Sequence, residues 1–248
     1  MRLVRFLHDN KVCSGVLYGD EVTVTALDNG PGRVKFDKIS LLAPVKPSKI
    51  VSVGLNYRDH AEELGMSIPT EPVIFIKPST AVIGPGEMIV YPESSARVDY
   101  EAELGVVIKN RIRNVSVEEA GRNIAGYTCF NDVTARDLQR KDTQWSRAKS
   151  FDTFAPIGPW IETDIDPGNL RIRSYLNGEL KQDSRTSEFI FGIPRLIEFI
   201  SGIMTLLPGD VIATGTPSNI GPMNAGDEIV IEIEGIGRLT NYIKRKED

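Results

Sequence analysis

Apolar and polar residues alternate along parts of this chain, which is the pattern of half-buried strands. It is clearest at residues 12–18 and 21–26, which flank Gly19-Asp20, a pair that is typical of a hairpin turn. Apolar or alternating stretches predict further strands at residues 49–53, 73–76, 88–91, 98–108, 127–130, 211–214 and 229–234. The chain is therefore expected to be rich in β-structure.

Short helices are expected between these strands, at residues 57–64, 116–124, 134–140 and 194–204. Ser116 and Glu119 form a capping box, Gly65 is a suitable C-terminal stop, and Pro194 suits a first helical turn. Scattered short helices among many strands favour an α+β fold that is mainly β over a regular alternation of strands and helices.

A proline-bearing segment at residues 41–48 divides the chain. Residues 1–46 are expected to form a small N-terminal β domain, and residues 47–248 a larger domain that holds the candidate chemistry. The net charge is −5 and no basic stripe is present, which argues against nucleic acid as a partner.

Cysteine content and hydropathy predict the compartment. Cys13 and Cys129 cannot supply a zinc quartet or a disulfide framework, and they fit a reducing compartment. No apolar run reaches membrane-spanning length, and the first residues lack the apolar core of a signal peptide. A cytoplasmic protein without membrane partners is expected.

Three acidic residues enter the expected core on one strand. Asp99, Glu101 and Glu103 alternate, so they share one face of the strand at residues 98–108. Beyond Glu103 both faces are apolar, and like charges there repel each other and lose hydration. A bound divalent cation would relieve this repulsion. The alternative is a partly exposed strand start with solvated acids.

Asp132 favours the metal interpretation because it lies between an expected strand and an expected helix, where a scaffold holds ligands rigidly. Its alternative role is an ordinary helix N-cap. With Glu101 and Glu103 it would form an all-oxygen site that suits Mg²⁺, Mn²⁺ or Ca²⁺ rather than zinc. Glu232 and Glu234 also alternate, but they belong to an amphipathic strand with one solvent-exposed face, and no function is expected for them.

Lys149 is surrounded in sequence by alanine and phenylalanine, so a free surface position is less expected. Its charge would bring three carboxylates and a divalent ion to a formal zero. It could then hold an anionic substrate or protonate a carbanion. The alternative is a surface lysine whose stem lies along apolar neighbours.

His60 and Glu63 are spaced to lie on one helix face. A carboxylate beside an imidazole fixes its tautomer and makes it a better base. The alternative is a pair of surface polar residues in a charged segment. The glycine-rich residues 214–221 follow a strand and could form a turn that faces a substrate, but they lack the end of a phosphate-binding loop.

Taken together, these segments resemble the fumarylacetoacetate hydrolase family. The matching segments follow the family's order and are residues 54–57 with His60 and Glu63, 99–104, 131–137 with Gln139, 149–154, 207–210 and 214–217. The resemblance implies a mixed β-sandwich roll with a small N-terminal β domain, assembled as a homodimer. Residues 218–221 depart from the small glycine-rich turn of many members, which bears on the far end of the substrate.

The resemblance also implies site residues. It implies Mg²⁺ or Mn²⁺ held by Glu101, Glu103 and Asp132, and Lys149 orienting the substrate or its enolate. His60 and Glu63 would activate water on a mobile lid helix. The residues implied to contact substrate oxygens are Arg136, Gln139 and Thr216.

The implied chemistry is conversion of a small 2-oxo or 2-hydroxydienoic (di)acid through a metal-chelated enolate. Isomerisation, as in 2-hydroxyhepta-2,4-diene-1,7-dioate and 5-carboxymethyl-2-hydroxymuconate isomerases, or decarboxylation is favoured. The alternatives are a C–C hydrolase of β-diketo acids, similar to acylpyruvase or fumarylpyruvate hydrolase, and an oxaloacetate decarboxylase. A non-catalytic ligand-binding dimer with a structural metal is the alternative of another class, and the His60–Glu63 pair argues against it.

Overall fold

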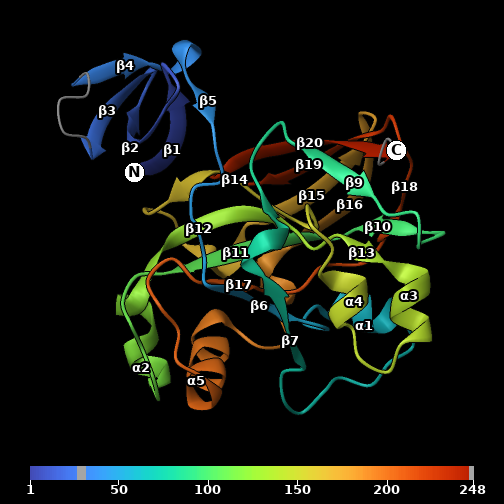
Figure 1. Cartoon of the computed structure of the whole chain (residues 1–248). Coiled ribbons are helices and arrows are strands. Elements are labelled where there is room, and N and C mark those ends of the chain that lie inside the picture. Colours follow the sequence, from blue (N-terminus) through green and yellow to red (C-terminus); the bar gives the residue numbers. More distant parts are fainter. Residues whose placement is uncertain (27–31, 246–248) are drawn as a thin grey trace.

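The computed structural model describes residues 1–26 and 32–245. Its first strands form a separate lobe, coloured blue in Figure 1. These strands are β1 (Arg2–His8), β2 (Lys11–Tyr18), β3 (Glu21–Ala26), β4 (Arg33–Lys35) and β5 (Ser40–Leu41). The hairpin predicted around Gly19-Asp20 is confirmed, because β2 and β3 pair antiparallel on either side of it. Phe6 and Val22 are fully buried in the core of this lobe.

The remaining strands of the largest sheet belong to the second lobe. They are β6 (Lys49–Val53), β7 (Ile74–Pro78), β8 (Val82–Ile83), β11 (Ala102–Ile108), β12 (Ile124–Asn131), β14 (Ala155–Glu162) and β17 (Val211–Ala213). The strand order is β4-β3-β2-β1-β14-β12-β11-β17-β6-β7, with β5 paired to β1 and β8 paired to β14. The sheet thus continues from the N-terminal lobe into the strands that hold the acidic residues.

Two smaller sheets complete the second lobe. A five-stranded sheet contains β9 (Met88–Tyr91), β15 (Arg171–Leu176), β16 (Glu179–Arg185), β19 (Glu228–Ile233) and β20 (Gly237–Arg245). It packs against β11, β12 and β14, which makes a sandwich (Figure 1). A three-stranded sheet contains β10 (Val98–Tyr100), β13 (Thr134–Ala135) and β18 (Gly221–Met223). This mainly β arrangement confirms the predicted fold class.

Helices cover two regions of the second lobe. They are α1 (Arg58–Glu63), α2 (Val117–Ala120), α3 (Arg136–Lys141), α4 (Ser146–Lys149) and α5 (Ile193–Ile203). α2 and α5 pack together at one end, and α1, α3 and α4 gather at the other (Figure 1). Across the part of the chain that the structure describes, no helix is both long and apolar enough to cross a membrane.

Three expected elements differ from the structure. The strand predicted at residues 98–108 is interrupted at Glu101, where the chain leaves the three-stranded sheet and joins the large one. The helix expected from residue 134 begins only at Arg136, because Thr134 and Ala135 pair with β10. The capping box at Ser116 is present, but the α-helix ends at Ala120 and a 3₁₀ turn follows.

Candidate metal and substrate site

The strand pairing brings three carboxylates together. β11 and β12 are antiparallel, with Ala102 opposite Asn131, so Glu101 and Glu103 lie beside the end of the strand that leads to Asp132. One ligand oxygen from each of Glu101, Glu103 and Asp132 lies within 4.8 Å of the others, and all three residues are buried. Every residue from Ala102 to Ile108 is buried, so this strand does run into the core as predicted.

Lys149 lies at this acidic cluster, as its apolar sequence neighbours suggested. Its Nζ donates to Oε2 of Glu101 at 2.9 Å and to Oδ2 of Asp132 at 2.6 Å. Burial alone would lower the pKa of Lys149, but Asp132 and Glu101 outweigh it and raise the pKa above its usual value. The ammonium is therefore held in its charged form beside the carboxylates.

Lys77, which the sequence did not single out, is a second buried lysine at the same cluster. Its Nζ donates to Oδ1 of Asp132 and, at 3.0 Å, to the carbonyl oxygen of Val133. Burial lowers the pKa of Lys77, and the attraction of Asp132 offsets this only in part. Asp132 therefore lies between two ammonium groups. The formal charge count expected from the sequence, with three carboxylates, one lysine and one divalent ion, left out the second lysine.

Glu103 offers a carboxylate oxygen to a cation. Its Oε2 accepts from the backbone N–H of Gly215 at 2.9 Å, whereas Oε1 is buried and has no hydrogen-bond partner among the described residues. Gly215 has φ of +93°, and a Cβ there would lie 2.8 Å from the Cβ of Asn56, so only glycine fits this approach. A buried unpaired carboxylate oxygen beside Glu101 and Asp132 fits an oxygen-coordinated divalent ion.

The carboxyl pKa values differ strongly within the cluster. Burial, followed by the charges of Asp132 and Glu101, raises the pKa of Glu103 well above its usual value. Burial also acts to raise the pKa of Glu101, but Lys149 and Arg136 outweigh it and lower the pKa to about 2. Glu101 is therefore ionised at neutral pH, and Glu103 holds its proton more tightly than an exposed glutamate.

Mg²⁺ affinity is expected to rise with pH, because a bound divalent ion must displace the proton that the raised pKa of Glu103 retains. Where the metal-free Glu103 is protonated and the metal-bound Glu103 is not, displacement of one proton would change the affinity by about tenfold per pH unit. Calorimetric titration at about pH 6 and about pH 8 measures this. Glu103→Gln should bind more weakly and without the pH dependence. An affinity that does not change with pH in the unaltered protein would contradict the expectation.

Arg136 lies beside the carboxylates at the start of α3. Its Nε donates to Asp99 at 2.9 Å, one amino group donates to Glu101, and the other donates to Oε1 of Gln139 at 2.5 Å. Asp99 also accepts two hydrogen bonds from Arg97, at 2.8 and 3.1 Å. Asp99 thus shares the acidic face as expected, but it pairs with arginines rather than joining the three-carboxylate group.

The His60–Glu63 pair forms on α1 at the spacing that the sequence indicated. Nδ1 of His60 lies 2.9 Å from Oε2 of Glu63. The imidazole is buried and Glu63 is partly exposed. The other oxygen of Glu63 accepts from the backbone N–H of Asn219 at 3.1 Å. The turn at residues 218–221 therefore contacts the pair directly.

Thr216 is buried, and its hydroxyl accepts a hydrogen bond from Nε2 of Gln182 at 2.9 Å. The oxygen of the same Gln182 side chain accepts from the N–H of Ala102 at 3.0 Å. Gln182 was not predicted, and it joins the turn of Thr216 to the start of β11. A substrate contact by Thr216 remains a prediction.

A cavity of about 620 Å³ brings most of these side chains together. The predicted site residues that line it are His60, Glu63, Glu101, Arg136, Gln139 and Lys149. Its apolar walls include Leu55, Val73, Trp145 and Ile220. The His60–Glu63 pair, Lys149 and one carboxylate of the acidic cluster, Glu101, therefore meet in one space large enough for a small organic acid, whereas Glu103, Asp132 and Thr216 do not line it.

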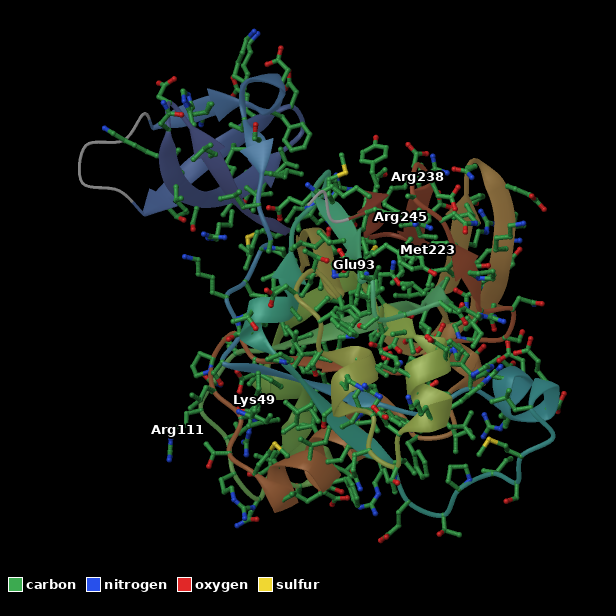
Figure 2. All side chains as sticks on the ribbon, turned by 45° about the vertical axis from the view of Figure 1, so that its right-hand side comes forward. Lys49, Glu93, Arg111, Met223, Arg238 and Arg245 are labelled. Atoms are coloured by element: carbon green, nitrogen blue, oxygen red, sulfur yellow. The ribbon has the colours of Figure 1, made fainter. Side chains whose placement is uncertain are left out.

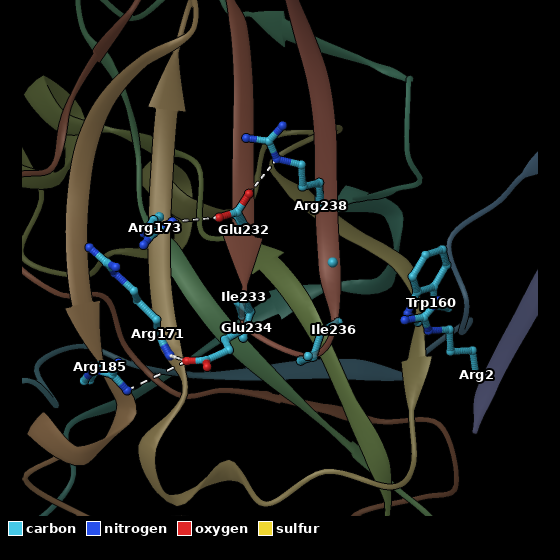
Figure 3. Close-up of a pocket in the computed structure, with 12 residues that line it drawn as sticks. Arg2, Trp160, Arg171, Arg173, Arg185, Glu232, Ile233, Glu234, Ile236 and Arg238 are labelled. Atoms are coloured by element: carbon cyan, nitrogen blue, oxygen red, sulfur yellow. Dashed lines mark hydrogen bonds and ion pairs between the residues drawn. The ribbon is translucent and has the colours of Figure 1, made fainter. Parts of the chain in front are cut away.

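A second cavity of about 600 Å³ lies on the outer face of the five-stranded sheet (Figure 3). Its arginines are already paired with carboxylates. Arg173 and Arg238 both donate to Glu232, and Arg185 lies near Glu234. These ion pairs are typical of a solvated sheet surface, which agrees with assigning no role to Glu232 and Glu234.

Comparison with protein families matches both parts of the chain. The profile of the fumarylacetoacetate hydrolase C-terminal family matches residues 49–244, and a profile described as Rv2993c-like, N-terminal matches residues 1–44. The oxaloacetate tautomerase fahd2 of Xenopus laevis mitochondria is 42% identical over 232 residues, which cover 88% of this chain and 73% of that protein.

Solved structures extend the similarity over the whole chain. The 5-carboxymethyl-2-hydroxymuconate delta-isomerase of Mycobacterium smegmatis superposes with a TM-score of 0.93 at 46% identity, and 100% of each chain is covered. The maleylpyruvate hydrolase of Sphingobium sp. SYK-6, solved with manganese(II) and pyruvate, has a TM-score of 0.85 at 31% identity and 100% coverage of each chain. The similar proteins thus include an isomerase, a tautomerase and a hydrolase.

Proposed function

This chain belongs to the fumarylacetoacetate hydrolase family, and from that premise we propose that it is a Mg²⁺- or Mn²⁺-dependent enzyme of small 2-oxo or 2-hydroxydienoic acids. Isomerisation, including keto–enol tautomerisation, or decarboxylation is the favoured reaction. The observation that supports this most is the single cavity whose lining joins the carboxylate Glu101 and Lys149 to His60. The homodimer, the cytoplasmic location and the division near residue 46 remain predictions.

The proposed metal ligands are Glu101, Glu103 and Asp132. When bound there, a divalent ion would act as a Lewis acid that favours the enolate form of a 2-oxo acid. The protein supplies the rigid frame for this site. Two of the carboxylates flank the start of β11, and Lys77 and Lys149 each hold one oxygen of Asp132. The ligand set is therefore fixed before the substrate arrives.

Lys149 is proposed to stabilise negative charge on the substrate. It is the buried ammonium that lines the cavity, and its own pKa is raised by Asp132 and Glu101 against the effect of burial. A charged donor in a space shielded from water interacts strongly with charge that develops on an oxygen next to it. Arg136 and Gln139 line the same wall and are proposed to contact substrate oxygens.

His60 is proposed to move protons, with Glu63 fixing its orientation. The Glu63 carboxylate accepts a hydrogen bond from Nδ1–H of His60. This leaves Nε2 as the ring nitrogen that is available to a substrate or a water molecule. In a tautomerisation, a proton leaves the carbon beside the 2-oxo group and the oxygen takes one up, so the base must reach the cavity. His60 lines that cavity.

Carbon–carbon hydrolysis is the second candidate reaction, and the His60–Glu63 pair is the observation that favours it. Hydrolysis of a β-diketo acid needs an activated water, and this pair could remove its proton. Decarboxylation of oxaloacetate needs no such water. A purely ligand-binding dimer would need neither the pair nor Lys149 in the cavity. Assay of the Mg²⁺-loaded protein against acylpyruvates, oxaloacetate and hydroxydienoates tests these candidates, and inactivity towards all of them would favour the binding dimer.

His60→Ala is expected to separate the reaction types. It should nearly abolish any acylpyruvate cleavage, because the water would lose its base, and spare a substantial part of any decarboxylation. Parallel measurement of kcat/KM for both substrates decides this. Equal losses in the two reactions would show that His60 does not act through water.

A further inference from the structure

Arg140 is the least engaged basic side chain at the candidate site. It lies in the last turn of α3, is exposed and lines the rim of the cavity. Within residues 1–26 and 32–245 its guanidinium forms no hydrogen bond and no ion pair. By contrast, Arg97 holds Asp99 with two hydrogen bonds, and each nitrogen of Arg136 donates to a protein acceptor. The donors of Arg140 are therefore available to a ligand.

The formal charge of the site supports a doubly charged ligand. Five basic and five acidic side chains line the cavity or belong to the charged cluster that includes its lining residue Glu101. The basic residues are Lys77, Arg97, Arg136, Arg140 and Lys149, and the acidic residues are Glu63, Asp99, Glu101, Glu103 and Asp132. With all of them ionised, these charges cancel. A bound divalent ion adds two positive charges, which a dianion would neutralise and a monoanion would not.

The spacing along α3 places Arg140 about one helical turn from Arg136. Arg136 contacts Glu101, one of the proposed metal ligands. Arg140 is four residues further on the same helix face, which corresponds to about 6 Å of axial rise. The metal end of the cavity and the Arg140 end are therefore about one helical turn apart along α3.

We propose that Arg140 is the specificity-determining residue that binds the second carboxylate of a dicarboxylic substrate, while the 2-oxo acid end lies at the carboxylate cluster. A guanidinium presents two parallel N–H groups that match a carboxylate. This inference rests on the proposed function, because the 2-oxo acid end must lie at the metal site. It adds that the enzyme distinguishes diacids from monoacids of similar shape through one side chain.

The test uses two unreactive ligands with the same oxalyl group. N-oxalylglycine carries a free second carboxylate, and in its glycine methyl ester that carboxylate is blocked. Calorimetric titration of the Mg²⁺-loaded protein should show tighter binding of the diacid by about tenfold, or about 1.4 kcal/mol. Arg140→Gln should reduce this preference to under about threefold and leave the affinity for the ester unchanged. Arg140→Lys should keep part of the preference.

Arg111 provides a matched control. It is exposed, is labelled at the lower left of Figure 2, and does not line the cavity. Arg111→Gln removes the same charge and should keep the full preference for the diacid. Equal affinities for the diacid and the ester in the unaltered protein, or a full preference in Arg140→Gln, would overturn the role of Arg140. Failure of both ligands to bind in the presence of Mg²⁺ would instead contradict the proposed function, and the inference with it.

Discussion

Replacement of Asp132 by asparagine is expected to abolish turnover and to weaken Mg²⁺ binding by more than about a hundredfold. Loss of an outer partner of a metal ligand alone costs about 10–100-fold, and this change removes the charge of a ligand itself. Asparagine keeps one acceptor oxygen, so it can still accept from Lys77 or from Lys149 but not from both, which donate to different oxygens of Asp132. The fold should therefore survive better than in Asp132→Ala, and a thermal melt checks this. Calorimetric titration with Mg²⁺ measures the loss.

The matched control for this variant is Glu232→Gln, which removes one carboxylate charge from the outer sheet. Glu232 pairs with Arg173 and Arg238 on a partly exposed surface (Figure 3), so its loss should cost no more than about 1 kcal/mol of stability. Its Mg²⁺ affinity and activity should be unchanged. If Asp132→Asn folds and binds Mg²⁺ as tightly as this control, Asp132 is not a ligand.

Lys149→Met is expected to lower kcat/KM on the order of a hundredfold or more while keeping the length of the side chain. The variant removes the ammonium that lines the cavity beside Glu101 and Asp132. Steady-state kinetics on the best substrate of the assay panel would measure the effect. A loss of less than about threefold would exclude any role of Lys149 in stabilising charge on the substrate.

Lys77→Met tests whether Lys149 stabilises charge on the substrate or only neutralises the buried carboxylates. Lys77 is as deeply buried as Lys149 and also donates to Asp132, but it does not line the cavity. Both variants leave a buried carboxylate with one cation fewer and should lose stability by a similar amount. Lys77→Met should retain much more activity. Equal loss of activity in the two would mean that Lys149 acts only as a counter-charge to Asp132.

The acidic cluster could be predicted because its signal is local. Glu101 and Glu103 alternate at the start of a stretch that has no polar face. Acidic residues are unexpected at the entrance to an apolar core, and this is visible within a few residues. Asp132 was identified by its place at a strand end. The antiparallel pairing of β11 with β12 then brings the three carboxylates together, which a sequence can suggest but not establish.

Lys77 and Gln182 could not be predicted because their signals are long-range. Lys77 lies 55 residues from Asp132 in sequence and follows the end of the strand expected at residues 73–76, where a single lysine ordinarily faces water. Gln182 belongs to a polar stretch of β16 whose sequence predicts solvent exposure. Its side chain nevertheless forms hydrogen bonds with both Ala102 and Thr216. In the same way, the cross-strand pairing of Thr134 and Ala135 with β10 overrode a helical preference that was judged from neighbouring residues alone.

The continuity of the large sheet places a strand of the N-terminal lobe, β1, along the edge of β14 in the second lobe. β14 pairs with β12 on one side, and its other side is shared by β8 at Ala155 and Pro156 and by β1 at Ile161 and Glu162. Without β1, the N–H and C=O groups at that end of β14 would be open to strands of other molecules, which is a common route to aggregation. Removal of the small lobe is therefore expected to expose this end of β14 and to favour aggregation.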